Sequence, residues 1–272
     1  MTRAVERLLG LLDLAHGEAS EAATIWRGEP GGALNLSNRL FGGLVVAQTI
    51  VAAGRTHSDR EVHSVQQVFL RAGTGDAPLQ YRVERLFTGR TYASVRVEVI
   101  QGDQVISHAQ VGITAGIDGP DRQADAPVLV PPEQMVNRDE LRDRDGWQDM
   151  PVEMFIDPST DGDGLATQAS WIRPRGDMPD DPLMHKAVLG YASDRALMSV
   201  AWRPHGAGSS FTGSTLDHSI WFHRPVSFDG WHSYVMHSPT IAGGRGLNHG
   251  AIHDAAGTLV ASAVQQGTYR PV

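Results

Sequence analysis

The sequence contains no cysteine among its 272 residues, which excludes disulfides, thiolate nucleophiles and cysteine-ligated metal sites. It also lacks any apolar run near the about 18 residues that a membrane-spanning helix requires. Positive charge is scarce: the formal net charge is −8, and non-specific binding to nucleic acid requires a basic surface. We therefore expect a cytoplasmic protein without a membrane span and without nucleic acid as a partner.

Hydrophobic residues make up 41% of the chain, enough for one large domain or two of ordinary size. Leucines at helical spacing between positions 4 and 14 predict an amphipathic leading helix rather than a signal peptide. Residues 41–55 are apolar almost all round, which predicts a buried helix that begins at Gly42 and Gly43. Four short alternating runs between 62 and 114 then predict antiparallel strands.

The second half of the chain follows the same plan. A helical pattern covers 181–200, with Asp180 or Asp181 as its N-cap, and four strand-like runs follow. The intervening residues, 117–146, are rich in proline, aspartate and arginine, which is typical of a linker that crosses the surface. We therefore expect an N-terminal unit with its leading helix at 1–116, a linker at 117–146 and a C-terminal unit at 147–272.

An internal repeat supports this division. Three separated pairs of segments align at a constant offset of 155 residues: His63-Ser64 with His218-Ser219, Gly89-Arg90 with Gly244-Arg245, and 107–112 with 262–267. A repeat of this period indicates a duplicated unit, here one long helix followed by about four strands. A two-layer α+β unit, in which an antiparallel sheet wraps around its helix, would bury a helix that is apolar on all sides.

The two copies differ in residues that can carry chemistry. Asp194, Thr215 and Gln265 combine an acid, a hydroxyl and an amide in the second half. Their first-half counterparts in the alignment are Gln48, Arg60 and Gln110. Asp194 is either a helix-surface acid paired with Arg195 or a carboxylate that acts as general base or orients a water.

The stretch STLDHSIWFHRP, residues 214–225, contains an Asp-His pair and two serines. Strand alternation predicts Thr215 and Asp217 on one face and His218 on the other, so Asp217 and His218 cannot form a catalytic pair. No G-x-S-x-G motif exposes a serine nucleophile. His218 and His223 are predicted on opposite faces, so we expect no metal site and interpret these histidines as framework.

Several longer motifs resemble the acyl-CoA thioesterase II family of double-hotdog enzymes. They are AVERLLGLLDL (4–14), FGGLVVAQ (41–48), FLRAG (69–73), WIRPRGDMPDD (171–181), LGYASD (189–194), STLDHSIWFHRP (214–225) and LVASAVQQG (259–267). The resemblance covers almost the whole chain in order. It implies an α+β double hotdog: two tandem hotdog units, each an antiparallel sheet wrapped around a long central helix.

The resemblance also implies hydrolysis of an acyl-CoA thioester to a free fatty acid and CoA, without a cofactor or metal. In that family an aspartate, a threonine and a glutamine hold and activate one water, and Asp194, Thr215 and Gln265 occupy the matching positions. Backbone N–H groups at Gly42 and Gly43 are expected to bind the substrate, because a helix N-terminus favours negative charge.

Residues 238–250 depart from the family pattern of two arginines, because Arg245 is kept but His249 stands at the second basic position. We expect these two residues to bind the CoA phosphates. The family suggests a homo-oligomer, a dimer or a tetramer. Two other functions stay open from the residues: an acyl-CoA or acyl-carrier binding protein without turnover, and a hotdog dehydratase, although the latter usually pairs a histidine with an acid in one site.

Overall fold

The computed structural model describes residues 4–20, 22–31, 39–140, 150–157, 166–206 and 211–272. Within these residues, thirteen strands form one antiparallel sheet, ordered β1-β2-β4-β5-β6-β3-β11-β14-β13-β12-β9-β8-β7. The strands of this sheet in the first half are β1 (Ala15–Ala19), β2 (Ala23–Gly28), β3 (Glu61–Phe69), β4 (Leu79–Thr88), β5 (Tyr92–Gln101) and β6 (Gln104–Thr114). Those that follow are β7 (Val136–Asn137), β8 (Val152–Ile156), β9 (Thr167–Pro174), β11 (Thr215–Phe222), β12 (His232–Ala242), β13 (Arg245–His253) and β14 (Leu259–Thr268).

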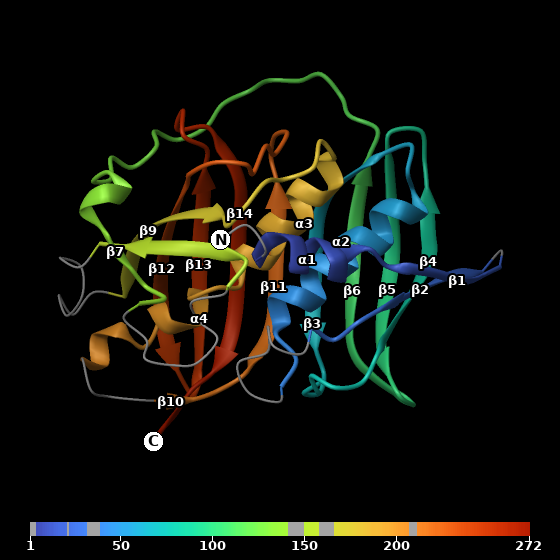
Figure 1. Cartoon of the computed structure of the whole chain (residues 1–272), viewed down its shortest axis with the longest axis horizontal. Coiled ribbons are helices and arrows are strands. Elements are labelled where there is room, and N and C mark those ends of the chain that lie inside the picture. Colours follow the sequence, from blue (N-terminus) through green and yellow to red (C-terminus); the bar gives the residue numbers. More distant parts are fainter. Residues whose placement is uncertain (1–3, 21, 32–38, 141–149, 158–165, 207–210) are drawn as a thin grey trace.

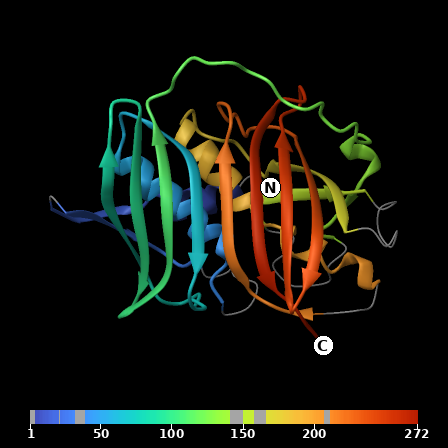
Figure 2. The same cartoon turned by 180° about the vertical axis from the view of Figure 1, so that it is seen from behind.

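The order of the strands is symmetric about the junction of β3 with β11. Moving outward from it, β6, β5, β4 and β2 are matched by β14, β13, β12 and β9. Figure 2 shows the two halves side by side as a blue-green group and an orange-red group. A separate two-stranded ladder pairs β10 (Phe211–Thr212) with β15 (Arg270–Pro271). The predicted duplication is thus present as two α+β units that share one continuous sheet.

The helices lie on one face of this sheet (Figure 1). They are α1 (Ala4–Leu12), α2 (Gly42–Thr56), α3 (Pro182–Ser193) and α4 (Leu197–Val200), with short 3-10 turns at η2 (Pro132–Gln134) and η5 (Arg203–His205). Helix α2 is buried from Gly43 through Gly54, as a helix apolar on all sides requires. Asp181 caps α3 by accepting a hydrogen bond from the Leu183 N–H at 2.9 Å, which confirms the predicted cap.

The strand registers correct the sequence alignment of the two halves. Val65 of β3 pairs with Val111 of β6, whereas Ile220 of β11 pairs with Ala263 of β14. The offset between the halves is therefore 155 residues for β3 and β11 but 152 for β6 and β14. The constant offset is wrong for the last strand, because the span between equivalent residues of the last two strands is three residues shorter in the second half, from Gly250 to Ala263 instead of from Val95 to Val111. Gln265 consequently has a different first-half counterpart from the one predicted.

The segment that joins the two halves begins without regular structure and ends in a short turn and an edge strand. Residues 117–131 carry no regular structure and arch over one end of the sheet (Figure 2). The chain then forms η2, and β7 adds a short edge strand to β8. Asp139, two residues beyond β7, is buried. No helix among the described residues is long and apolar enough to cross a membrane.

Candidate active site

Asp194 lies where a helix predicted to run through residue 200 is interrupted. Helix α3 ends at Ser193, Asp194 is its C-cap, and Ala196 adopts a left-handed conformation with φ of 66° before α4 begins. The prediction of one continuous helix over 181–200 is therefore wrong. The interruption ends the helix at the acid, so that the carboxylate is presented at the C-terminal end of α3, next to the sheet.

Gln265 of β14 joins Asp194 and Thr215 into one hydrogen-bonded group. Its Nε2 donates to Asp194 Oδ1 at 2.5 Å and to Thr215 Oγ1 at 2.9 Å. The Gln265 side chain is fully buried, and the Asp194 side chain is only 7% exposed. Three residues separated by up to 71 positions thus meet through one amide group. Because both protons of that amide are used, it fixes its two partners relative to each other.

A β-bulge brings Thr215 to the same face of the sheet as Gln265. Thr215 pairs with Gly267 and Asp217 pairs with Gln266, so β11 has one extra residue between them. Beyond the bulge, His218 pairs with Gln265 and therefore points to the same side. Strict alternation had predicted Thr215 and His218 on opposite faces, and that prediction is wrong because the extra residue reverses the alternation.

His218 consequently lies against the acid rather than away from it. Its Nδ1 is 3.9 Å from Asp194 Oδ1, and its Nε2 is 2.9 Å from Ser193 Oγ. The side chain is fully buried, and burial lowers the pKa of the His218 imidazole, an effect opposed by Asp194 and Asp217. Sequence reasoning missed this contact, since the bulge leaves no mark in the hydrophobic pattern.

The N-terminus of α2 meets the C-terminus of α3 at the same place. A Cβ atom placed on Gly42 would lie 3.0 Å from Asp194 Oδ2, and one placed on Gly43 would lie 2.6 Å from the Tyr191 carbonyl oxygen. The two glycines therefore allow α2 to approach the acid closely. The first N–H groups of a helix have no partner within it and carry positive partial charge, so this end of α2 stabilises the Asp194 carboxylate.

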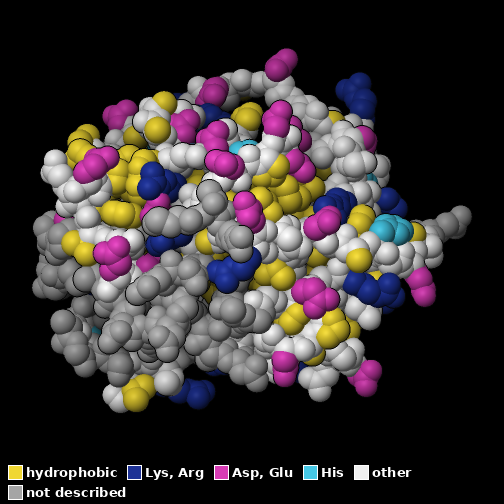
Figure 3. Space-filling model, viewed as in Figure 1, with side chains coloured by type: hydrophobic (Ala, Val, Ile, Leu, Met, Phe, Trp, Pro, Cys, Tyr) yellow, Lys and Arg dark blue, Asp and Glu magenta, His cyan; other side chains and the backbone are white. Residues whose placement is uncertain are grey.

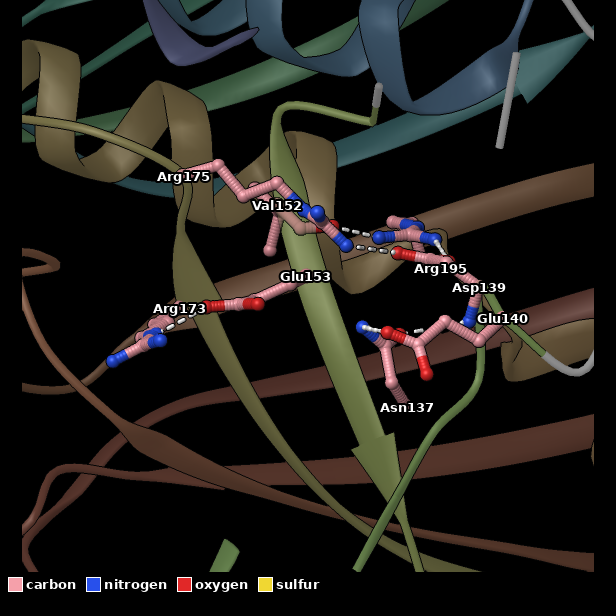
Figure 4. A network of polar contacts seen from close by, with 8 residues as sticks. All are labelled: Asn137, Asp139, Glu140, Val152, Glu153, Arg173, Arg175 and Arg195. Atoms are coloured by element: carbon pink, nitrogen blue, oxygen red, sulfur yellow. Dashed lines mark hydrogen bonds and ion pairs between the residues drawn. The ribbon is translucent and has the colours of Figure 1, made fainter. Parts of the chain in front are cut away.

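Arg195, the residue after the acid, belongs to a buried ion-pair network, drawn in Figure 4. It donates to Asp139 Oδ1 at 2.5 Å and also to the Val152 carbonyl oxygen, while Arg175 contacts the other oxygen of Asp139 at 3.1 Å. Arg195 is only 3% exposed. The Asp194 side chain is itself only 7% exposed, so the interpretation of it as a helix-surface acid is wrong. The network instead anchors the chain directly after Asp194.

Among its described residues, the first half does not assemble an equivalent group at the counterpart positions. The register gives Ile113 as the counterpart of Gln265, while Gln110 is exposed and donates to Ser94 Oγ at 3.2 Å. Gln48 is a fully bonded core residue, whose Oε1 accepts from Tyr81 at 2.6 Å and whose Nε2 donates to two backbone carbonyls. The acid, hydroxyl and amide come together in the second half.

Arg245 and His249 are not brought to this group. Asn248, between them on β13, pairs with Gln265 and shares its face, so the alternation puts both basic residues on the outer face of the sheet. His249 lies beside His237 of β12, with ring centroids 5.0 Å apart. Binding of CoA phosphates by Arg245 and His249 stays a prediction.

Two further features bear on ligands. In the described part of the chain, no three histidine, aspartate or glutamate side chains are grouped closely enough to hold a metal ion. Acidic and basic side chains are interspersed over the face in Figure 3, and they do not form a basic stripe there. The chemistry of the site is that of a carboxylate, a hydroxyl, an amide and an imidazole beside a helix N-terminus.

Comparison with known proteins agrees with this description. Residues 143–268 match the family model described as acyl-CoA thioesterase, and residues 31–114 match the model of the acyl-CoA thioesterase N-terminal domain. The chain is 33% identical to acyl-coenzyme A thioesterase 8 of Mus musculus over 259 residues, which cover 86% of this chain and 81% of the relative.

Two solved structures extend the comparison. The acyl-CoA thioesterase II TesB2 from Mycobacterium marinum superposes with a TM-score of 0.82 at 32% identity, covering 99% of this chain and 98% of that one. A hot dog fold protein from Alicyclobacillus acidocaldarius superposes with a TM-score of 0.78 at 16% identity over 99% of each chain. Fold and family together define a double-hotdog thioester hydrolase. The chain belongs to the acyl-CoA thioesterase II family.

Proposed function

We propose that the protein hydrolyses acyl-CoA to a free fatty acid and CoA with a water that is activated by Asp194, Thr215 and Gln265. The observation that carries this proposal is the bridging amide: Gln265 Nε2 bonds both Asp194 and Thr215. A carboxylate held in this way has a fixed direction, and its oxygens keep lone pairs that can accept from a water. General-base catalysis of this kind contributes about 10²–10⁴-fold to a rate.

Each of the three side chains has a distinct part in this mechanism. The Asp194 carboxylate accepts a proton from the attacking water as the water oxygen bonds to the thioester carbon. Thr215 Oγ1 accepts from Gln265 and therefore keeps its own hydrogen, which faces Met198 Sδ at 3.4 Å in this structure. Sulfur is a weak acceptor, so this hydrogen is easily redirected to a water or to the substrate.

The carbonyl oxygen becomes an oxyanion during the attack and needs hydrogen-bond donors. The first N–H groups of α2, at Gly42 and Gly43, lie beside the acid and suit this role because of their direction and the helix dipole. The C–S bond then breaks, and the proton held by Asp194 passes to the sulfur of the departing CoA. Atoms balance with water as the only co-substrate.

The test is a panel of acyl-CoA substrates of increasing chain length, with release of CoA measured by a thiol reagent. We expect turnover for at least one chain length. Thr215→Val, which removes the hydroxyl, should lower kcat strongly, whereas Thr215→Ser, which keeps it, should retain most activity. Tight binding of acyl-CoA without thiol release at any length would instead establish a binding protein. As further parts of the proposal, the family suggests a cytoplasmic homo-oligomer, dimer or tetramer, that acts in fatty acid metabolism.

A further inference from the structure

Buried polar side chains form a row across the sheet beneath α3. Gln67 of β3, His218 of β11 and Gln265 of β14 are successive cross-strand partners, and each is fully buried. Three buried atoms in this row have no hydrogen-bond partner among the described residues: Gln67 Oε1, His218 Nδ1 and Gln265 Oε1. Buried polar atoms are bonded in the great majority of cases, so such a group indicates a place where another molecule binds.

The hydrogen bonds of Ser193 determine which nitrogen of His218 carries the proton. Ser193 Oγ lies 2.9 Å from the Gly190 carbonyl oxygen and 2.9 Å from His218 Nε2. A serine hydroxyl has one hydrogen, and a carbonyl oxygen can only accept. Ser193 therefore donates to Gly190 and accepts from His218, so the imidazole carries its hydrogen on Nε2. Nδ1 consequently presents a lone pair.

That lone pair faces the catalytic acid. His218 Nδ1 and Asp194 Oδ1 are 3.9 Å apart, and both are acceptors, so they do not bond each other directly. A water oxygen about 2.8 Å from each atom would subtend an angle of about 90° between them, close to the opening between the two O–H bonds of water. One water can therefore donate to both.

The surroundings of His218 favour its neutral form. Asp194 faces it from α3 and Asp217 precedes it on β11, and both raise its pKa. The partners on the two neighbouring strands, Gln67 and Gln265, are neutral amides. Desolvation outweighs the two acids and lowers the pKa of His218, which keeps the Nδ1 lone pair free at neutral pH.

We propose that His218 is a further catalytic residue, whose Nδ1 accepts one hydrogen of the attacking water while Asp194 accepts the other. This inference rests on the proposed function. A water that donates both hydrogens has an oxygen lone pair free to attack the thioester carbon. On attack the proton passes to Asp194 and later to the sulfur, and His218 stays neutral and orients the water throughout.

Two amide substitutions separate this role from a structural one. In His218→Asn, the amide occupies the position of Nδ1 and its oxygen can accept from the water, but the bond to Ser193 is lost. In His218→Gln, the amide reaches the position of Nε2 and can still donate to Ser193, but no acceptor replaces Nδ1. We expect His218→Gln to lower kcat about 100-fold and His218→Asn about tenfold.

The order of the two variants decides the question. A residue that acts only through its bond to Ser193 would give the reverse order, with His218→Gln the more active, and that result or equal activity would overturn the proposal. Thermal stability should follow the bond to Ser193, with His218→Gln the more stable variant, so stability and activity should rank the pair in opposite orders.

Ser193→Ala tests the same inference without altering the histidine. Without the serine acceptor, the hydrogen of His218 moves readily to Nδ1, where it points at Asp194 and displaces the water. We expect kcat to fall about tenfold with KM unchanged, and an unchanged kcat would overturn the inference. Asp194→Asn, measured in parallel, distinguishes a failure of this inference from a failure of the proposed function. If Asp194→Asn also retains full turnover, the proposed function is wrong. If Asp194→Asn is inactive while Ser193→Ala is unchanged, only the proposed role of His218 is wrong.

Discussion

Gly42→Ala is expected to slow catalysis without unfolding the protein. The added methyl group would lie 3.0 Å from Asp194 Oδ2 and 3.3 Å from Phe69 Cζ, whereas ordinary contacts begin at 3.4 Å. Backbone strain is not an issue, because Gly42 is not among the residues of positive φ. The new contact therefore acts on the carboxylate, which must shift by about 0.4 Å or rotate away from Gln265.

The size of the effect follows from how strongly catalysis depends on position. A displacement of about 1 Å can cost about 100-fold in rate, so a shift of about 0.4 Å should lower kcat roughly tenfold. Gly10→Ala is the matched control, because a Cβ at that position in α1 meets no atom within 4 Å. It should stabilise the protein by about 0.5–1 kcal/mol and leave kcat unchanged.

Gly43→Ala gives the contrasting outcome. Its methyl group would lie 2.6 Å from the Tyr191 carbonyl oxygen, which belongs to the backbone and cannot move away cheaply. We expect this variant to lose thermal stability, whereas Gly42→Ala loses rate. Release of CoA thiol and a thermal melt on each purified variant measure the two effects. A wild-type kcat in Gly42→Ala would refute the placement of the acid against this glycine.

Three further predictions concern charge. Asp139→Ala removes a buried carboxylate that contacts both Arg195 and Arg175 and should destabilise the fold by about 3–5 kcal/mol in urea unfolding, with a smaller loss for Asp139→Asn. Equal stability would contradict the network. Gln265→Glu places a second carboxylate beside the Asp194 oxygen and should lower kcat at least 100-fold at neutral pH, measured by CoA release. The activity should recover in part only at a pH at which one of the two acids is protonated. Burial lowers the pKa of His218 and of His232 below the ordinary 6.5, so near and below that pH the unfolded chain binds more protons than the folded one. The free energy of unfolding should therefore be constant above pH 7 and decrease as the pH falls below 6.5. A flat profile down to pH 5 would contradict this.

Much of the architecture follows from periodicity and composition. The all-round apolar pattern of α2, the Asp181 cap of α3 and the alternation of β3 to β6 each arise from local rules and are visible in the sequence. The short strands β2 and β9 were not predicted, because each is determined by pairing with its neighbours in the sheet rather than by a strong hydrophobic pattern of its own.

The structure brings together the three residues proposed from the sequence, but their geometry was not predicted. The family resemblance identified Thr215, whereas strict alternation put it on the wrong face relative to His218, because a one-residue bulge has no signature in hydrophobicity. The ion pair of Arg195 with Asp139 joins residues 56 positions apart, and such a contact depends on tertiary packing. The sequence thus indicates the residue types of the candidate site but does not predict the tertiary contacts that orient them.

The central claim, that Asp194 is the base of a water-mediated hydrolysis, is tested most directly by kcat for Asp194→Asn beside Asp217→Asn. The first substitution keeps the shape of the side chain and removes its basicity. Asp217 is the control, because it pairs with Gln266 and its side chain lies on the outer face of the sheet, away from the site. We expect Asp194→Asn to lose about 10²–10⁴-fold in kcat and Asp217→Asn to remain close to wild type. Comparable activity in the two variants would contradict the account.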